Sequence, residues 1–301
     1  MIRQEYRNQV ILLLTILPEV NKEKCFALHG GTAINLFIMN MPRLSVDIDV
    51  TYKPIEERDV SLRKINEALL RIKASIESQV AAVEVTHLTS QLKLLISTKD
   101  ASIKLEVNQI KRGVYAPSFE AVLCERAQND FDIFCSMSVV SLGQVYGGKI
   151  CAALSRQHPR DLFDIKLLLE KLGLSNEVKI GLLFCLLGDS RPFHEILSPT
   201  LLDQQYVMEN QFQGMTSEPF TYDDFIDTRQ RLISEVQGCL TDYDKEFLLG
   251  VMRLEPDWSK YSFQDFPAIR WKLMNLEKLN VENEKKYKEQ YIALEQLLLS
   301  R

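Results

Sequence analysis

The chain has 301 residues, 46% of them hydrophobic, enough to bury one large core or two modest ones. Its formal net charge of −5 excludes a broadly basic protein that wraps nucleic acid, but allows a local basic site. Six cysteines without a C-x-x-C pair and only four histidines give no sign of a zinc site. The longest early apolar run, Val10–Leu17, is too short to span a bilayer. We therefore expect a cytoplasmic protein with reduced thiols, no signal peptide and no membrane association.

The first half of the chain predicts a mixture of helices and strands. Arg3–Leu17 has the apolar spacing of an amphipathic helix, and Phe26-Ala27-Leu28 forms an apolar lead-in to a glycine turn. Thr32–Met39 then predicts a helix with Thr32 in the position of an N-cap. A further helix is predicted over Arg58–Ser78.

The glycine turn is followed at short range by two acids. His29-Gly30-Gly31-Thr32 precedes Arg43-Leu44-Ser45-Val46-Asp47-Ile48-Asp49-Val50 by ten residues. In a strand, Asp47 and Asp49 share one face while the apolar residues that alternate with them face the core. Two such carboxylates repel unless they protrude into water or share a cation, and their hard oxygen atoms suit Mg²⁺. Glycines at a helix start allow backbone N–H groups to approach a phosphate. The residues alone leave open a surface strand with two solvated aspartates.

A third carboxylate that could join the two aspartates lies in a later β-rich run. Gln91–Ser97 and Ser102–Asn108 are β-rich runs whose spacing predicts a hairpin. In the second run the apolar residues alternate with polar ones, which places Glu106 on a polar face as for the two aspartates. Glu106 is therefore the candidate third acid. The alternative is an ordinary solvent-facing glutamate.

A second group of charged residues lies between residues 145 and 165. Lys149 and Arg156 are seven residues apart, two helical turns along one side of a predicted helix. Pro159 separates this helix from the next, in whose first turn Asp161 is favoured by the helix dipole. Asp161 and Asp164 are neighbours on one face because they are three residues apart.

The same region contains a pattern that we reject. Gly143 to Lys149 satisfies G-x-x-x-x-G-K, but a phosphate-binding P-loop needs Ser or Thr after the lysine, and Ile150 follows here. From Ser141 onward nearly every segment predicts a helix. These helices are expected at Asp161–Leu172, Asn176–Leu187, Tyr222–Leu240, Asp242–Leu254 and Ala268–Leu299, the last interrupted near residues 280–283.

Both groups of residues carry a family resemblance. G-G-[TS]-A followed by R-x-S-x-D-I-D resembles the nucleotidyltransferase superfamily of DNA polymerase beta. K-x-x-A-x-x-x-R followed by R-D-x-x-D-[LI] is similar to later motifs of the AbiEii/AbiGii toxins of type IV toxin–antitoxin and phage abortive-infection systems. The matches cover most of the chain, with the sharp motifs confined to residues 29–49 and 149–165.

The resemblance implies an α+β fold and a set of site residues. A small mixed sheet with flanking helices forms the catalytic core over residues 1–135, and a mainly helical domain over 136–301 contributes Lys149 and Asp161 to the active site. The implied nucleotide-binding residues are Gly30, Gly31, Thr32, Lys149 and Arg156. The implied catalytic residues are Asp47, Asp49, Lys149 and Asp161. The implied metal ligands are Asp47 and Asp49, and Glu106 is added to them as the third candidate from strand alternation.

Some roles stay open within this assignment. Asp161 either orients Lys149 or acts as a base toward the acceptor. Arg156 and Arg160 either hold phosphate or pair with Asp161 and Asp164.

The implied function is that of an enzyme. A Mg²⁺-dependent nucleotidyltransferase would move a nucleoside monophosphate from an NTP to an acceptor, with the tRNA 3′ end expected. It would act as a toxin inhibited by a cognate antitoxin protein. The alternatives are a protein or small-molecule (antibiotic) acceptor, or a nucleotide-binding module without catalysis.

Overall fold

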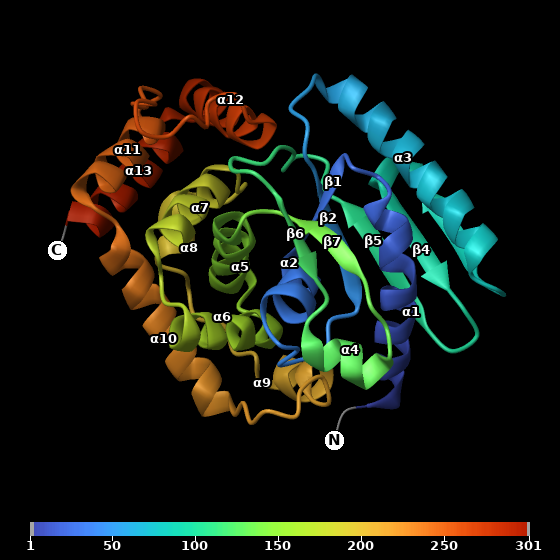
Figure 1. The fold of residues 1–301 in the computed structure, drawn as a ribbon. Helices are drawn as coiled ribbons and strands as arrows, with labels where there is room; N and C mark the ends of the chain where they lie inside the picture. Colours follow the sequence, from blue (N-terminus) through green and yellow to red (C-terminus); the bar gives the residue numbers. More distant parts are fainter. Residues whose placement is uncertain (1–2, 300–301) are drawn as a thin grey trace. The chain divides into compact units, whose positions relative to one another are not determined.

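The computed structural model describes residues 3–299 (Figure 1). The chain forms two compact units. One unit contains the residues up to Ser141 together with Asn210–Pro219; the other contains Leu142–Glu209 and the residues from Phe220 onward. Within the described range, the first unit holds a seven-stranded mixed sheet and the second is helical. The predicted α+β class is confirmed. None of the described helices is both long and apolar enough to cross a membrane.

The sheet of the first unit places the acid-bearing strand near its middle. Its order is β3-β4-β5-β2-β1-β7-β6, with β2 parallel to β5 and antiparallel to β1. The strands are β1 (Phe26–His29), β2 (Asp47–Tyr52), β3 (Glu84–Leu88), β4 (Lys93–Ser97), β5 (Ser102–Val107), β6 (Phe119–Val122) and β7 (Ser136–Val139). The predicted hairpin is confirmed as the antiparallel pair β4–β5.

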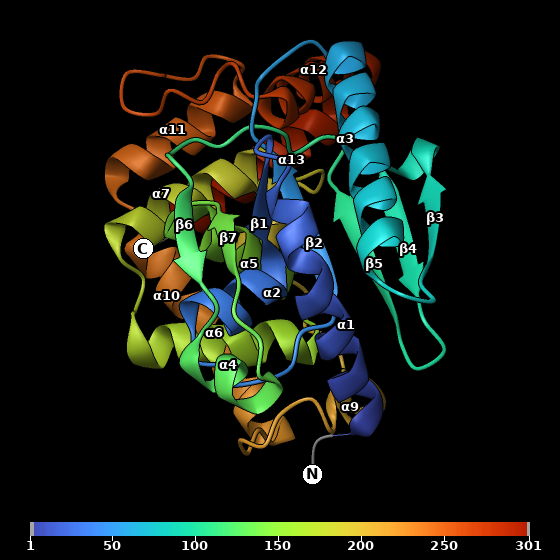
Figure 2. The same ribbon diagram turned by 45° about the vertical axis from the view of Figure 1, so that its right-hand side comes forward.

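Two long helices cover one face of this sheet. Helix α1 (Gln4–Asn21) contacts β5, helix α3 (Arg58–Gln79) contacts β3 and β4, and the two helices contact each other (Figures 1 and 2). Alternating residues of the strands, such as Leu94 and Leu105, are fully buried. Their neighbours in sequence therefore point to the opposite face, which carries the acids. The remaining helical segments of this unit are α2 (Gly30–Thr32), the π-helix η1 (Ala33–Ile38), the 3₁₀-helix η2 (Thr89–Gln91) and α4 (Glu125–Phe131).

The second unit is built from helices that begin at strong capping signals. Ser175 caps α7, and Thr221 and Thr241 form capping boxes at the starts of α10 and α11. The elements are α5 (Leu142–Arg156), α6 (Pro159–Lys171), α7 (Asn176–Leu187), α8 (Phe193–Leu197), α9 (Gln205–Val207), α10 (Tyr222–Cys239), α11 (Asp242–Met252), α12 (Pro267–Glu282) and α13 (Glu284–Leu299). A π-helix, η3 (Met208–Phe212), follows α9. The helices expected after Ser141 are therefore confirmed, with the last interruption at Asn283.

The glycines of the rejected P-loop pattern have a packing role. Gly143 and Gly147 lie inside helix α5, where the backbone of α7 approaches closely. A β-carbon at Gly147 would lie 2.2 Å from the carbonyl carbon of Gly181, and one at Gly181 would lie 1.9 Å from the carbonyl oxygen of Gly143. These glycines allow two helix backbones to cross in contact, and they form no phosphate-binding loop.

Candidate active site

The glycine turn of the first unit fits closely around the acid strand. Gly30 has a φ of +72°, and a β-carbon there would lie 2.7 Å from Oδ2 of Asp49. A β-carbon at Gly31 would lie 2.9 Å from Nη2 of Arg43. A side chain at Gly30 would be strained both by this contact and by the left-handed backbone, whereas one at Gly31 would displace the Arg43 guanidinium. The turn brings its backbone directly against Asp49 and Arg43.

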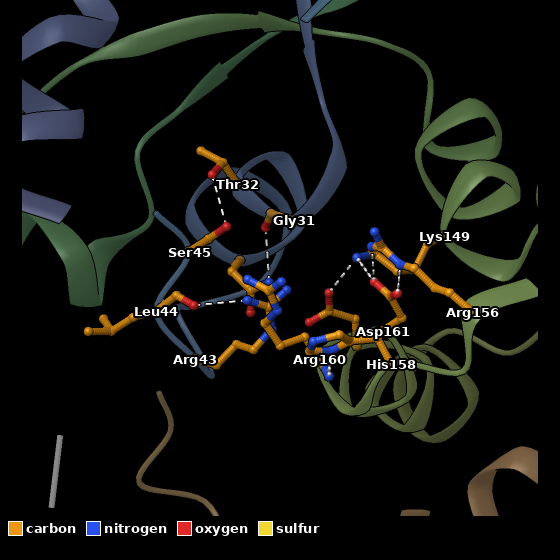
Figure 3. Close-up of polar contacts among 12 residues, drawn as sticks. Gly31, Thr32, Arg43, Leu44, Ser45, Lys149, Arg156, His158, Arg160 and Asp161 are labelled. Carbon is orange, nitrogen blue, oxygen red and sulfur yellow. Dashed lines mark hydrogen bonds and ion pairs between the residues drawn. The ribbon is translucent and has the colours of Figure 1, made fainter. Parts of the chain in front are cut away.

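Thr32 links this turn to the acid strand and is not an N-cap. The predicted cap at Thr32 is wrong: its φ of −68° and ψ of −41° are already helical, whereas extended His29 stands at the cap position. The Thr32 side chain is buried, with 1% exposed. Its hydroxyl donates a 2.5 Å hydrogen bond to the backbone oxygen of Asp47 and lies 3.0 Å from Oγ of Ser45 (Figure 3). The threonine thereby fixes the first residue of β2 against the helix start.

Arg43 is a component of this region that the sequence reasoning left without a role. It is buried, and its Nη1 donates to the backbone oxygen of Leu44 at 2.9 Å (Figure 3). The signal available in the sequence was its place in the R-x-S-x-D-I-D motif. The structure sets its guanidinium beside Gly31, where the two glycines turn.

The strand register brings the three candidate acids onto neighbouring strands. Asp47 and Asp49 are half-buried residues of β2, and they pair with Lys104 and Glu106 of parallel β5. Among residues 3–299, the Asp47 carboxylate makes no hydrogen bond or ion pair. Within the same range, no three His, Cys, Asp or Glu side chains are grouped as a metal site. The two aspartates are thus a pair of hard oxygen donors on one face of a strand.

Glu106 is held between two lysines. Its carboxylate oxygens lie 2.9 Å from Nζ of Lys93 and 2.8 Å from Nζ of Lys104. Burial would raise the pKa of Glu106, but the hydrogen bonds and charges of the two lysines outweigh it and lower the pKa. Burial opposes the charge of Lys104, yet Glu106 and the two aspartates together raise the pKa of this lysine. The face of the sheet that carries the acids therefore also carries two lysine ammonium groups.

In the second unit, Lys149 and Arg156 converge on Asp161 (Figure 3). Nζ of Lys149 lies 2.9 Å from both Oδ1 of Asp161 and Oδ2 of Asp164. Nε and Nη2 of Arg156 lie 2.6 and 3.0 Å from the two oxygens of Asp161. The lysine and both aspartates are buried, whereas the Arg156 side chain is 61% exposed. Pro159 at the first position of α6 and the His158 cap start the helix where Asp161 and Asp164 face α5.

The electrostatics of this cluster distinguish between the two roles left open for Asp161. Burial alone would raise its pKa, but the charge of Lys149 and the hydrogen bonds from Arg156 lower the pKa far below the usual range of a carboxyl. A carboxylate with so low a pKa is a weak proton acceptor. The geometry therefore favours Asp161 as the residue that orients Lys149 and Arg156. Asp164, to which the sequence assigned no separate role, contacts the same ammonium group of Lys149.

The sequence of the chain matches a known protein family. The family model described as nucleotidyl transferase AbiEii toxin, type IV toxin–antitoxin system, matches residues 11–275. The chain belongs to the AbiEii family. It is a nucleotidyltransferase toxin of a type IV toxin–antitoxin system, as the motifs predicted. No curated protein matches the sequence.

A solved structure has a fold similar to that of this chain. It is MenT4, nucleotidyltransferase toxin Rv2826c from Mycobacterium tuberculosis H37Rv, with a TM-score of 0.63 and 13% sequence identity. The similarity covers 90% of this chain and 93% of that chain. At this identity the likeness concerns the fold. The site residues predicted from the sequence lie in both units. The first unit contains Gly30, Gly31, Thr32, Asp47, Asp49 and Glu106, and the second contains Lys149, Arg156 and Asp161.

Proposed function

We propose that this AbiEii-family enzyme uses Mg²⁺ to transfer a nucleoside monophosphate from an NTP to the 3′ end of tRNA. The observation that carries the proposal is the packing of the Gly30-Gly31 turn directly against Asp49 on the acid strand. This arrangement holds a backbone that can approach phosphate beside two carboxylates that can bind a cation. The tRNA acceptor rests on the family resemblance.

The residues present fit a magnesium ion. Mg²⁺ is bound in proteins by one or two carboxylates together with substrate phosphates, so the pair Asp47 and Asp49 is a sufficient protein contribution. Within residues 3–299 the carboxylate of Asp47 accepts no hydrogen bond that would compete with a cation, and Lys104 is the lysine whose charge it faces. When bound, the ion would offset the charge of the phosphates and favour displacement of pyrophosphate. Glu106 as a third ligand stays a prediction, since it would have to give up a lysine. A Glu106→Gln variant that needs no more Mg²⁺ for half-maximal transfer than wild type would contradict it.

The other residues have roles that follow from their contacts. Gly30 and Gly31 leave room for the phosphates, and Thr32 keeps the turn attached to β2. From the family resemblance we assign Lys149 to neutralising the triphosphate, and its contact with Asp161 holds its ammonium group in place. Arg156 is the exposed cation of that cluster, which makes it the group most accessible to a phosphate.

A label-transfer experiment tests the proposal. The protein is incubated with Mg²⁺ and each α-³²P nucleotide in turn, together with total bacterial RNA and lysate protein. An Asp47→Ala, Asp49→Ala double variant serves as the matched control. Label on RNA of tRNA size with wild type alone supports the proposal and identifies the nucleotide. Label on protein keeps the transferase and replaces the acceptor. Absence of label from both, with nucleotide still bound, moves the function to a small-molecule acceptor or a binding module.

A further inference from the structure

The sheet face that carries Asp47 and Asp49 continues across the strands beyond them. In the first row of the register, Asp47 pairs with Lys104 of β5, which pairs with Leu95 of β4. In the second row, Asp49 pairs with Glu106, which pairs with Lys93 of β4. Register partners point to the same side of a sheet. A continuous strip made of Lys93, Leu95, Lys104 and Glu106 therefore extends sideways from the acids. We call it the β5–β4 strip.

The strip is partly exposed and contains two lysines for one carboxylate of its own. The side chain of Lys104 is 41% exposed and that of Lys93 is 19% exposed, and Leu95 is 40% exposed although it lies between charged residues. The two lysines share the single carboxylate of Glu106, and Lys104 also faces the charges of Asp47 and Asp49, so its charge becomes available to a ligand when a cation occupies the two aspartates. Helices α1 and α3 cover only the opposite face of these strands. In a chain with a net charge of −5, such a patch can attract an anionic ligand locally.

We propose that the β5–β4 strip binds the single-stranded 3′ end of the RNA acceptor. This inference rests on the proposed function and names the surface that recognises its substrate. Neighbouring strands lie about 4.8 Å apart, so Lys104 and Lys93 stand roughly one and two strand spacings from the acids. A phosphate chain that leads to Asp47 and Asp49 therefore meets the two lysines in succession.

The chemistry of the strip favours RNA over a protein ligand. Lysine and glutamate are depleted in the cores of protein–protein interfaces, whereas lysine ammonium groups are ordinary contacts for a nucleic-acid backbone. Single-stranded RNA also exposes its bases, and exposed Leu95 offers an apolar surface between the two lysines. The strip contains no group that would read a particular base. We therefore expect recognition of the RNA backbone with little dependence on sequence.

The test measures RNA binding without transfer. A single-stranded RNA with a fluorophore on its 5′ end is titrated with the full-length protein in the absence of NTP, and anisotropy is recorded at several salt concentrations. The Lys93→Ala, Lys104→Ala double variant should bind about tenfold more weakly at 0.1 M salt. Its slope of log affinity against log salt should shrink by about 1.4, because two lysine–phosphate contacts are lost. Replacement of both lysines by arginine should restore binding.

Two further variants sharpen the test. Lys99 lies in the turn between β4 and β5, is 89% exposed and is outside the strip, so Lys99→Ala should leave affinity and slope unchanged. Glu106→Gln should tighten binding, because it frees the charges of both lysines. Unchanged binding by the double alanine variant overturns the inference, as does equal loss with Lys99→Ala or a wild-type protein that binds no RNA. Strip-dependent binding without label transfer leaves the inference standing and refutes the proposed function instead.

Discussion

Gly30 shows at the scale of one residue how the backbone and the acid strand depend on each other. We predict that Gly30→Ala lowers nucleotide transfer by about 100-fold, since a displacement of roughly 1 Å at a reacting group can have that effect. The methyl group would press on Oδ2 of Asp49 in addition to occupying a left-handed backbone position.

Gly173 is a matched control for this change. It also has a positive φ, of +67°, but a β-carbon there would meet nothing within 4 Å. Gly173→Ala should therefore lose about 1–2 kcal/mol of stability from the backbone alone and keep its activity. Thermal unfolding and steady-state transfer are measured for both variants. Equal activity of the two would show that Asp49 tolerates the contact.

Replacement of Asp161 is expected to lower the free energy of unfolding by an amount that depends on pH. Asp161→Asn removes the charge that Lys149 and Arg156 share, and breaking a buried ion pair typically costs about 3–5 kcal/mol; since Asp164 still pairs with Lys149, we expect the lower end of that range. The pKa of Asp161 is lower in the folded protein than in the unfolded chain, where it is about 3.9. Its contribution is therefore complete above that unfolded pKa and is lost as the pH falls toward the folded pKa.

Urea unfolding followed by circular dichroism at pH 7 and at acid pH checks this prediction. The difference between wild type and Asp161→Asn should be large at pH 7 and smaller in acid. Asp242→Asn, which changes an exposed acid in the first turn of α11, serves as the control and should differ from wild type by less than about 1 kcal/mol. A constant difference at both pH values would argue against the assigned ionisation of Asp161.

The residues whose contacts could be anticipated from the sequence are those joined by helical periodicity. Lys149 and Arg156 reach the same carboxylate because seven residues make two turns, and Asp161 and Asp164 reach the same lysine because they are three apart. The position of Arg43 beside Gly31 could not be anticipated, since it depends on how the chain returns after the turn.

The ion pairs of Glu106 could not be predicted from the sequence pattern, because they depend on how the strands pair. Strand alternation places Glu106 on a polar face, but its partner Lys93 is set by the register of the hairpin. The same limit explains why strands β3, β6 and β7 were not predicted. They are four or five residues long, and β7 takes its place through pairing of Val139 with Leu28, far away in the sequence. Long amphipathic helices such as α3 needed no such partner to be recognised.

At the scale of elements, the close crossing of α5 and α7 predicts that alanine at Gly181 lowers the stability of the protein, whereas alanine at Gly238 in α10 raises it. Gly181→Ala should destabilise the protein by about 3 kcal/mol or more, because its methyl group meets the backbone of Gly143, which cannot rotate away. In Gly238→Ala the methyl group would meet nothing within 4 Å, and α10 should gain up to about 1 kcal/mol. Chemical denaturation of both variants measures the two effects. Stabilisation by Gly181→Ala would contradict the close crossing.

The whole molecule belongs to a family of nucleotidyltransferase toxins. The amount of protein needed to stop growth can tell whether such a toxin acts by catalysis or only by binding. A typical turnover of about 10 per second lets one enzyme modify about 600 acceptors per minute, so a toxin that works by transfer acts far below the concentration of its target. A module that only sequesters a nucleotide or an RNA must approach that concentration. We therefore predict growth arrest at low induction of the wild-type chain. Arrest should be absent for Asp47→Asn at any level at which that variant is soluble.

Titrated expression with quantitative immunoblotting and growth curves measures this prediction, and Gly238→Ala serves as the folded control because its methyl group meets nothing. Asp47 is suited to the test because its carboxylate makes no hydrogen bond or ion pair within residues 3–299, so its replacement by asparagine removes a charge near Lys104 and breaks no hydrogen bond. Equal toxicity of wild type and Asp47→Asn at matched amounts would mean that the acid pair is dispensable in the cell. The toxic effect would then arise from binding, even with the fold and the glycine turn intact.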